Sequence, residues 1–199
     1  MKTDRIITIG RQHIADLIDP QLGATVIHNV GYPKEGLVAE MTKLLPDFKT
    51  PPQGKLVSNY EFYCLPVVGN IWAEFAALVA ADLNDQLGDV LGTRNAFEFD
   101  DLYLTRYAEP ESGSAIGVGA HRDTNCKGIV AVFILKGELP FVVCPEGREY
   151  VPLPVCPGEL LLMRADDCGQ LPRPLHFVGE IGRRSVIQFG MRQYIEKKK

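Results

Sequence analysis

GIVAVFILKGELPFVVCPEGREYVPLPVCPGELLLMR, residues 128–164, consists of short apolar runs separated by Gly, Pro and charged residues. Such runs, rich in β-branched and aromatic residues, predict strands. The four runs are GIVAVFILK, PFVVC, EYVPLP and ELLLMR, and CPEGREY between the second and third predicts a hairpin turn. Strands at this spacing without intervening helices favour an antiparallel sandwich or barrel over a parallel sheet.

The flanking sequence extends this pattern on one side and changes it on the other. DLYLTRY (101–107) and RSVIQFGMRQY (184–194) predict further strands. PKEGLVAEMTKLLPDF (33–48) and GNIWAEFAALVAADLNDQLGDVLG (69–92) instead show helical periodicity, with Gly92 expected just past the end of the second helix. The expected apolar face of that helix is Ile71, Trp72, Phe75, Leu78, Val79, Leu83, Leu87 and Val90. We therefore predict one domain, with a mainly helical part (1–97), a β core (98–193) and a tail (194–199).

Bulk composition excludes several classes of protein. The chain has 199 residues and a net charge of -4, which disfavours nucleic acid as a partner. The longest uninterrupted apolar run, FAALVAA, is too short for a membrane span, and the polar N-terminus does not resemble a signal peptide. The five cysteines are an odd number and include no C-x-x-C pair. These features predict a cytoplasmic protein without a membrane segment.

The triplet His-Arg-Asp in GAHRDTNCKG (119–128) is also found in the catalytic loop of protein kinases. That loop needs an Asn five residues after its Asp, but Gly128 stands there, and no D-F-G motif follows. A kinase core is excluded on these grounds.

A metal site is the other interpretation of this triplet. His121 and Asp123 are one residue apart, so a strand would present both side chains on one face. The chain has four His; His13 and His28 lie in the helical part, whereas His176 follows in the β-rich half. Two His and one carboxylate are the ligand set of non-haem Fe(II) oxygenases.

The motifs around these residues, in their order along the chain, resemble the 2-oxoglutarate/Fe(II)-dependent dioxygenase family, in particular its isopenicillin-synthase-like and plant-type branch. They are LYLTRYAEP, GAHRD, PGELLLMRADD, LPRPLHFV and RRSVIQF, over about residues 101–192. The resemblance implies an α+β protein: an all-β core, a double-stranded β-helix or jelly roll, with N-terminal helices packed on it.

The resemblance also implies roles for individual residues. His121, Asp123 and His176 match the Fe(II) ligands, and Arg183 and Ser185 match the R-x-S motif that binds the distal carboxylate of 2-oxoglutarate. Tyr107 matches a Tyr that helps to hold this cosubstrate, although Thr105 and Ala108 depart from the family's Asn and Pro.

The spacing leaves a choice between two arginines. Arg183 follows His176 more closely than in the plant enzymes, so Arg184 competes as the anchor. Arg183 shares a strand face with Ser185 and Ile187, whereas Arg184 goes with Val186 and Gln188. We prefer Arg183 on this basis.

Two residues are weaker candidates for contact with the substrate. Asn125 would share the face of His121 and Asp123 if their strand continued that far. Arg173, three residues before His176, would pair with a carboxylate of the substrate.

The implied reaction is the oxidation of a small molecule, hydroxylation by default, with Fe(II), 2-oxoglutarate and O₂ consumed and succinate and CO₂ released. Two alternatives remain: a catalytically inactive jelly-roll binding protein, and an Fe(II) oxygenase that does not use 2-oxoglutarate. The R-x-S motif counts against the second. The sequence does not identify the substrate or the oligomeric state.

Overall fold

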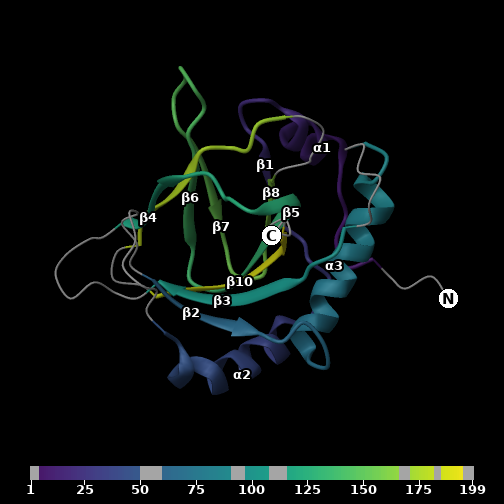
Figure 1. Ribbon diagram of the computed structural model, residues 1–199, viewed down its shortest axis with the longest axis vertical. Helices are drawn as coiled ribbons and strands as arrows, with labels where there is room; N and C mark the ends of the chain where they lie inside the picture. Colours follow the sequence, from purple (N-terminus) through teal and green to yellow (C-terminus); the bar gives the residue numbers. More distant parts are fainter. Residues whose placement is uncertain are drawn as a thin grey trace, which may run out of the picture.

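The computed structural model describes residues 5–49, 60–90, 97–107, 116–165, 171–181 and 185–194. Within them the chain forms two antiparallel sheets that face each other, with helices on the outer side of the larger sheet (Figure 1). The strands are β1 Ala24–Ile27, β2 Tyr60–Leu65, β3 Asp101–Tyr107, β4 Ile116–His121, β5 Cys126–Lys136, β6 Leu139–Val143, β7 Val151–Val155, β8 Leu160–Arg164, β9 His176–Glu180 and β10 Val186–Tyr194. The helices are α1 Arg11–Ile18, α2 Lys34–Leu44 and α3 Ile71–Leu87, with a 3₁₀ turn at Leu45–Asp47.

The larger sheet has the strand order β1-β8-β5-β10-β3-β2, and the smaller one the order β4-β9-β6-β7. This arrangement confirms the expected jelly roll. The predicted hairpin joins β6 and β7, where Val143 pairs with Val151. Apart from shifts of a residue or two at their ends, the strands predicted from sequence in the β-rich half are all present.

Two apolar clusters follow from the alternation of side chains along the larger sheet. On β10, Ile187, Phe189 and Met191 pack on α3 residues such as Trp72 and Phe75. Val186 lies on the opposite face, in the second cluster, which fills the space between the two sheets. The even-numbered positions of β10 therefore face the interior of the jelly roll.

Helix α3 agrees with its predicted apolar face up to Leu87, and Asn70 caps its start by accepting a hydrogen bond from the Ala73 amide (3.0 Å). The helix ends at Leu87, earlier than expected, so Val90 lies beyond it and is 47% exposed. Gly92, the expected end, is outside the described residues.

The N-terminal part contains two strands that the sequence did not predict. β1 pairs with β8, and β2 pairs with β3, so both edges of the larger sheet come from residues before 98. β1 is only four residues long and lacks clear alternation, since all four are buried. Pairing with strands far along the chain stabilises such a segment more than its own periodicity does. No helix among the described residues has the length and apolarity needed to cross a membrane.

Candidate metal centre

The two histidines come from adjacent strands of the smaller sheet. His121 is the last residue of β4 and pairs with His176, the first residue of β9. Their rings lie side by side, with centroids 4.4 Å apart. Because directly paired residues project to the same side of a sheet, both imidazoles enter the interior at one end of the jelly roll.

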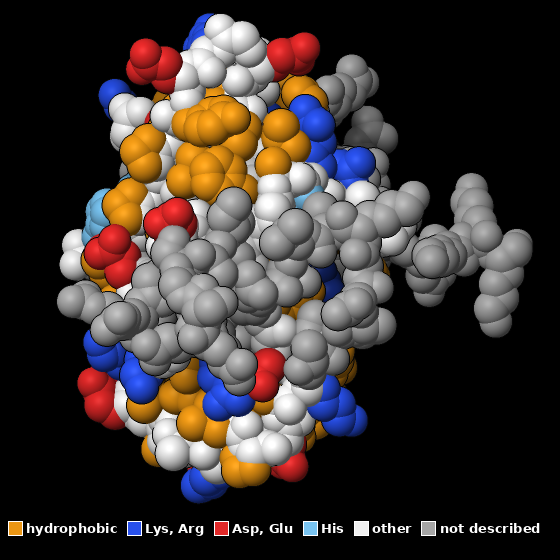
Figure 2. Space-filling model, turned by 90° about the vertical axis from the view of Figure 1, so that its left-hand side faces the viewer, with side chains coloured by type: hydrophobic (Ala, Val, Ile, Leu, Met, Phe, Trp, Pro, Cys, Tyr) orange, Lys and Arg blue, Asp and Glu red, His pale blue; other side chains and the backbone are white. Residues whose placement is uncertain are grey.

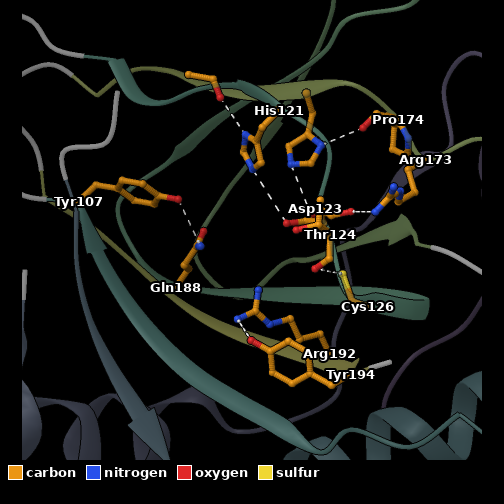
Figure 3. A network of polar contacts seen from close by, with 12 residues as sticks. Tyr107, His121, Asp123, Thr124, Cys126, Arg173, Pro174, Gln188, Arg192 and Tyr194 are labelled. Atoms are coloured by element: carbon orange, nitrogen blue, oxygen red, sulfur yellow. Dashed lines mark hydrogen bonds and ion pairs between the residues drawn. The ribbon is translucent and has the colours of Figure 1, made fainter. Parts of the chain in front are cut away.

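Asp123 reaches the same point from a loop. The sequence placed it on a strand with His121, but β4 ends at His121 and β5 begins only at Cys126. The connecting loop, rather than strand alternation, turns the carboxylate toward the two rings (Figure 3). Asp123 oxygens lie 3.9 Å from His121 Nε2 and 3.6 Å from His176 Nε2. One ligand atom from each of the three residues falls within 4.8 Å of the other two.

Backbone carbonyls fix the orientation of both rings. His121 Nδ1 donates to the Gly119 carbonyl (2.8 Å), and His176 Nδ1 donates to the Pro174 carbonyl (3.1 Å). A carbonyl only accepts, so each Nδ1 carries a proton, and Nε2 is the ring nitrogen that faces the space shared with Asp123. Second partners of this kind are what metal-binding histidines need.

Burial keeps one of the ligands neutral. The His176 side chain is 5% exposed and packs on Phe141. Burial lowers the pKa of His176 from its ordinary value, against the opposing effect of the Asp123 carboxylate. The imidazole is therefore in its metal-binding form near neutral pH. His121 and Asp123 are 20% and 24% exposed, so the centre opens to solvent on their side.

The donor set fits a divalent transition metal. Two imidazoles and one carboxylate on one side of a point leave the opposite positions free for other ligands, as in non-haem Fe(II) sites. His13 and His28 are not part of this cluster, as the sequence suggested.

Comparison with known proteins agrees with this geometry. No protein-family model matches the sequence, and no curated protein matches it. Solved structures do match: a 2-oxoglutarate-Fe(II) oxygenase family oxidoreductase from Burkholderia pseudomallei is 16% identical, with 96% of this chain and 95% of that one covered and a TM-score of 0.62. The jelly roll is that of the 2-oxoglutarate/Fe(II) oxygenases.

Two further structures with this oxygenase fold differ in what their names say they act on. A rice dioxygenase for auxin oxidation is 17% identical (TM-score 0.66), with 96% of this chain and 81% of that one covered. A prolyl hydroxylase from Trichoplax adhaerens, in complex with a hypoxia inducible factor peptide fragment, is 13% identical (TM-score 0.59), with 90% and 87% covered. At such identities the likeness concerns the fold.

The interior of this oxygenase fold contains Tyr107 at the end away from the metal centre. Tyr107 is buried, pairs with Val186 in the sheet, and its hydroxyl accepts a hydrogen bond from Gln188 Nε2 (3.4 Å). Gln188 is also buried, and its Oε1 has no hydrogen-bond partner among the described residues. The sequence did not single out Gln188, although it shares the predicted face of Val186.

Two arginines, Arg183 and Arg184, are the candidates for the cation that binds the distal carboxylate of the cosubstrate. Arg183 and Arg184 lie outside the described residues, and Ser185 precedes β10. The preference for Arg183 rests on the strand face that it would share with Ile187, and Ile187 packs against the helices. The face of Val186 is the one that points between the sheets. The choice between Arg183 and Arg184 therefore stays a prediction.

Arg173 makes local backbone contacts, and Asn125 lies in a turn. The Arg173 guanidinium donates to the Asp123 backbone carbonyl, and Arg122 Nε donates to the Arg173 carbonyl (3.2 Å). These bonds tie the loop of Asp123 to the segment before His176. Asn125 has a φ of 61°, a turn conformation that Asn tolerates well. Its strand does not continue, so the premise for placing it on the ligand face fails.

A cleft of about 390 Å³ lies beside the centre, lined in part by Ala120, Tyr150 and Leu175. The lining of this cleft includes none of His121, Asp123 and His176. The cleft is therefore distinct from the candidate metal centre. Figure 2 shows a group of hydrophobic side chains exposed on one face of the molecule.

Proposed function

We propose that this chain is an Fe(II)- and 2-oxoglutarate-dependent oxygenase that oxidises a small molecule, by default through hydroxylation. The convergence of His121, Asp123 and His176, with both imidazoles oriented by backbone carbonyls, is the observation that carries the proposal. The fold shared with oxygenases of this class supports it.

In this proposal the three ligands hold Fe(II) at the open end of the jelly roll. Bound iron, together with 2-oxoglutarate and O₂, supplies the oxidation of a C–H bond with release of succinate and CO₂. The chain's own task is to keep the ligands in place. The Nδ1 hydrogen bonds prevent ring rotation, and Arg173 holds the backbone of Asp123.

The cosubstrate would extend inward from the metal toward Tyr107. Its far carboxylate needs a cation, and we assign this role to Arg184 in preference to Arg183, because Arg184 would share the inward face of Val186 if the alternation of β10 continued two residues further back. Such a guanidinium would also supply the donor that Gln188 Oε1 lacks. Tyr107 and Ser185 would add hydroxyl donors, as the family resemblance implies.

A titration with Fe(II) without oxygen tests the metal and the cosubstrate together. Addition of 2-oxoglutarate to the Fe(II) protein is expected to produce the weak visible charge-transfer band of the chelated cosubstrate. His176→Ala should abolish the band. Arg184→Ala should raise the 2-oxoglutarate concentration needed by about 10- to 100-fold, the equivalent of one buried charged hydrogen bond or two. Arg183→Ala serves as the matched control.

The outcomes separate the alternatives. Protein that retains no iron and shows no band would indicate a jelly roll used for binding alone. Protein that retains iron and consumes O₂ without 2-oxoglutarate would indicate the other type of oxygenase. An effect of Arg183→Ala in place of Arg184→Ala would restore the anchor first expected from the sequence.

A further inference from the structure

A second arginine lies at the metal end of the jelly roll. Arg192 is near the end of β10, where Tyr194 pairs with Cys126, shortly after Asp123. Tyr107 and Val186 mark the opposite end of the same strands. Figure 3 shows Arg192 below Asp123, with its guanidinium pointing into the space between Gln188 and the metal ligands.

The guanidinium is held in a fixed plane. Arg192 Nε donates to the carboxylate of Asp101, its partner across β3, and Nη2 donates to the Tyr194 hydroxyl (3.1 Å). The rings of Tyr103 and Tyr194 lie 4.6 Å and 5.1 Å from its central carbon. The side chain is only 26% exposed. Within the described part of the chain, Nη1 has no hydrogen-bond partner.

Tyr103 reaches over β10 only because residue 190 is glycine. A Cβ at Gly190 would lie 2.2 Å from Tyr103 Cζ and 2.5 Å from its hydroxyl oxygen. The ring therefore lies across the inward face of the strand. Burial raises the pKa of Tyr103 and outweighs the opposing effect of the Arg192 guanidinium, so the phenol stays protonated and can donate a hydrogen bond.

We propose that Arg192, together with the Tyr103 hydroxyl, forms a subsite that binds a carboxylate of the substrate next to the metal. This inference rests on the proposed function and names its substrate class: a small carboxylic acid whose oxidised carbon lies a short distance from the carboxylate.

The chemistry of the cluster favours a carboxylate. A guanidinium with unused N–H groups in a partly buried space needs a planar acceptor, and a carboxylate matches its fork. Asp101 already balances part of the Arg192 charge, and Asp100 lies nearby, accepting from the Tyr194 amide. A single further negative charge suits this cluster better than a phosphate dianion.

The same sheet contains a matched control. Arg106 on β3 pairs with Glu61 on β2 and lies over the Phe48 ring, so it repeats the arrangement of cation, carboxylate and aromatic ring. Phe48 packs on the helix side of the sheet, away from the metal centre. If Arg192 were only a cross-strand ion pair, Arg106→Met and Arg192→Met would behave alike.

Ligand-observed NMR on the metal-free protein tests the subsite without turnover. The probes are a fragment set of carboxylic acids, each paired with its primary amide. The wild type and Arg106→Met should bind some acids in preference to their amides. Arg192→Met should weaken binding of those acids by about 10- to 100-fold and leave the amides unchanged. Arg184→Met should leave the binding of these acids unchanged.

The 2-oxoglutarate band, measured on Arg192→Met loaded with Fe(II), completes the test. Arg192→Met should need the same 2-oxoglutarate concentration as the wild type to form the band. A large increase in that concentration would assign Arg192 to the cosubstrate and overturn the inference. Acids that bind no better than amides, or whose binding depends on Arg184, would overturn it too, while an intact band would leave the oxygenase function standing. Acid binding that needs Arg192 in a protein without any band would support the subsite and reject the oxygenase function.

Discussion

Single carboxylates fix the N-terminal segment on α3. Asp82 is 9% exposed, and its Oδ2 accepts hydrogen bonds from the amides of Ile6 (2.8 Å) and Ile7 (2.9 Å). Asp82→Ala leaves both amides without this acceptor and should lower the free energy of unfolding by about 2–4 kcal/mol. Urea denaturation measures the loss.

Asp85, on the same helix, provides the control for this prediction. It pairs with Arg5, but both side chains are more than half exposed. Asp85→Ala should therefore cost less than about 1 kcal/mol. Equal losses for the two variants would mean that the Asp82 hydrogen bonds contribute no more than a surface ion pair.

Asp19 should make the free energy of unfolding fall at acidic pH. Its Oδ1 accepts from the amides of Leu22 (2.9 Å) and Gln21 (2.7 Å), and these bonds lower the pKa of the carboxyl below 3.8. Because the pKa of Asp19 is lower in the folded state than in the unfolded state, its carboxylate stabilises the fold at any pH above the unfolded-state pKa. This contribution to the free energy of unfolding is lost as the pH falls through the folded-state pKa. Asp19→Asn removes the titrating group.

The measurement is urea unfolding of the wild type and Asp19→Asn from about pH 5 to about pH 2. The stability advantage of the wild type should shrink as the pH falls below 3.8, because other carboxylates cancel in the difference. A difference that stays constant over this range would show that the carboxylate is not stabilised by these bonds.

At the scale of elements, the turn between β5 and β6 lies against the start of β10. Gly137, between β5 and β6, has a φ of +71°, and an added Cβ would lie 2.6 Å from the Ser185 carbonyl oxygen. Gly137→Ala combines a left-handed backbone cost with a backbone clash, so we expect a loss of about 2–4 kcal/mol in the free energy of unfolding.

Gly147, in the β6–β7 hairpin, is the matched comparison. Its φ is +69°, but nothing lies within 4 Å of an added Cβ. Gly147→Ala should cost only the backbone term, about 1–2 kcal/mol. If thermal or urea unfolding showed the same loss for both alanine variants, the contact between the β5–β6 turn and the start of β10 would have no energetic weight.

Elements also differ in how far sequence alone predicts them. Buried and less buried residues alternate over most of β3, and β5 is a long apolar run, so both strands could be predicted from sequence. The predicted bounds of β3, 101–107, match the structure. β1 and β2 were missed, because their stability comes from pairing with β8 and β3 rather than from their own pattern.

At the scale of the whole molecule, metal binding should couple to folding. The three ligands come from β4, β9 and the loop between β4 and β5, so they converge only in the folded chain. A metal that binds the folded form alone stabilises it by about 2.7 kcal/mol at a concentration 100 times its Kd. Fe(II) without oxygen should therefore raise the Tm, and a chelator should reverse the rise.

Variants locate the effect. Asp123→Ala and His176→Ala should show no rise in Tm with Fe(II). His28→Ala should show the full rise, because His28 is 67% exposed and pairs with Glu159 away from the centre. A rise that persists in His176→Ala would place the metal elsewhere.

The sequence by itself singled out His121, Asp123 and His176 and most of the strands, since spacing and alternation are local properties of the chain, and its family resemblance implied the jelly roll. Only the tertiary structure decided which face of β10 is the interior. Alternation states that Arg183 and Arg184 point to opposite sides, but the side covered by helices depends on Trp72 and Phe75, far away in the sequence. For the same reason the position of Arg192 beside the metal centre followed only from the pairing of β10 with β3 and β5.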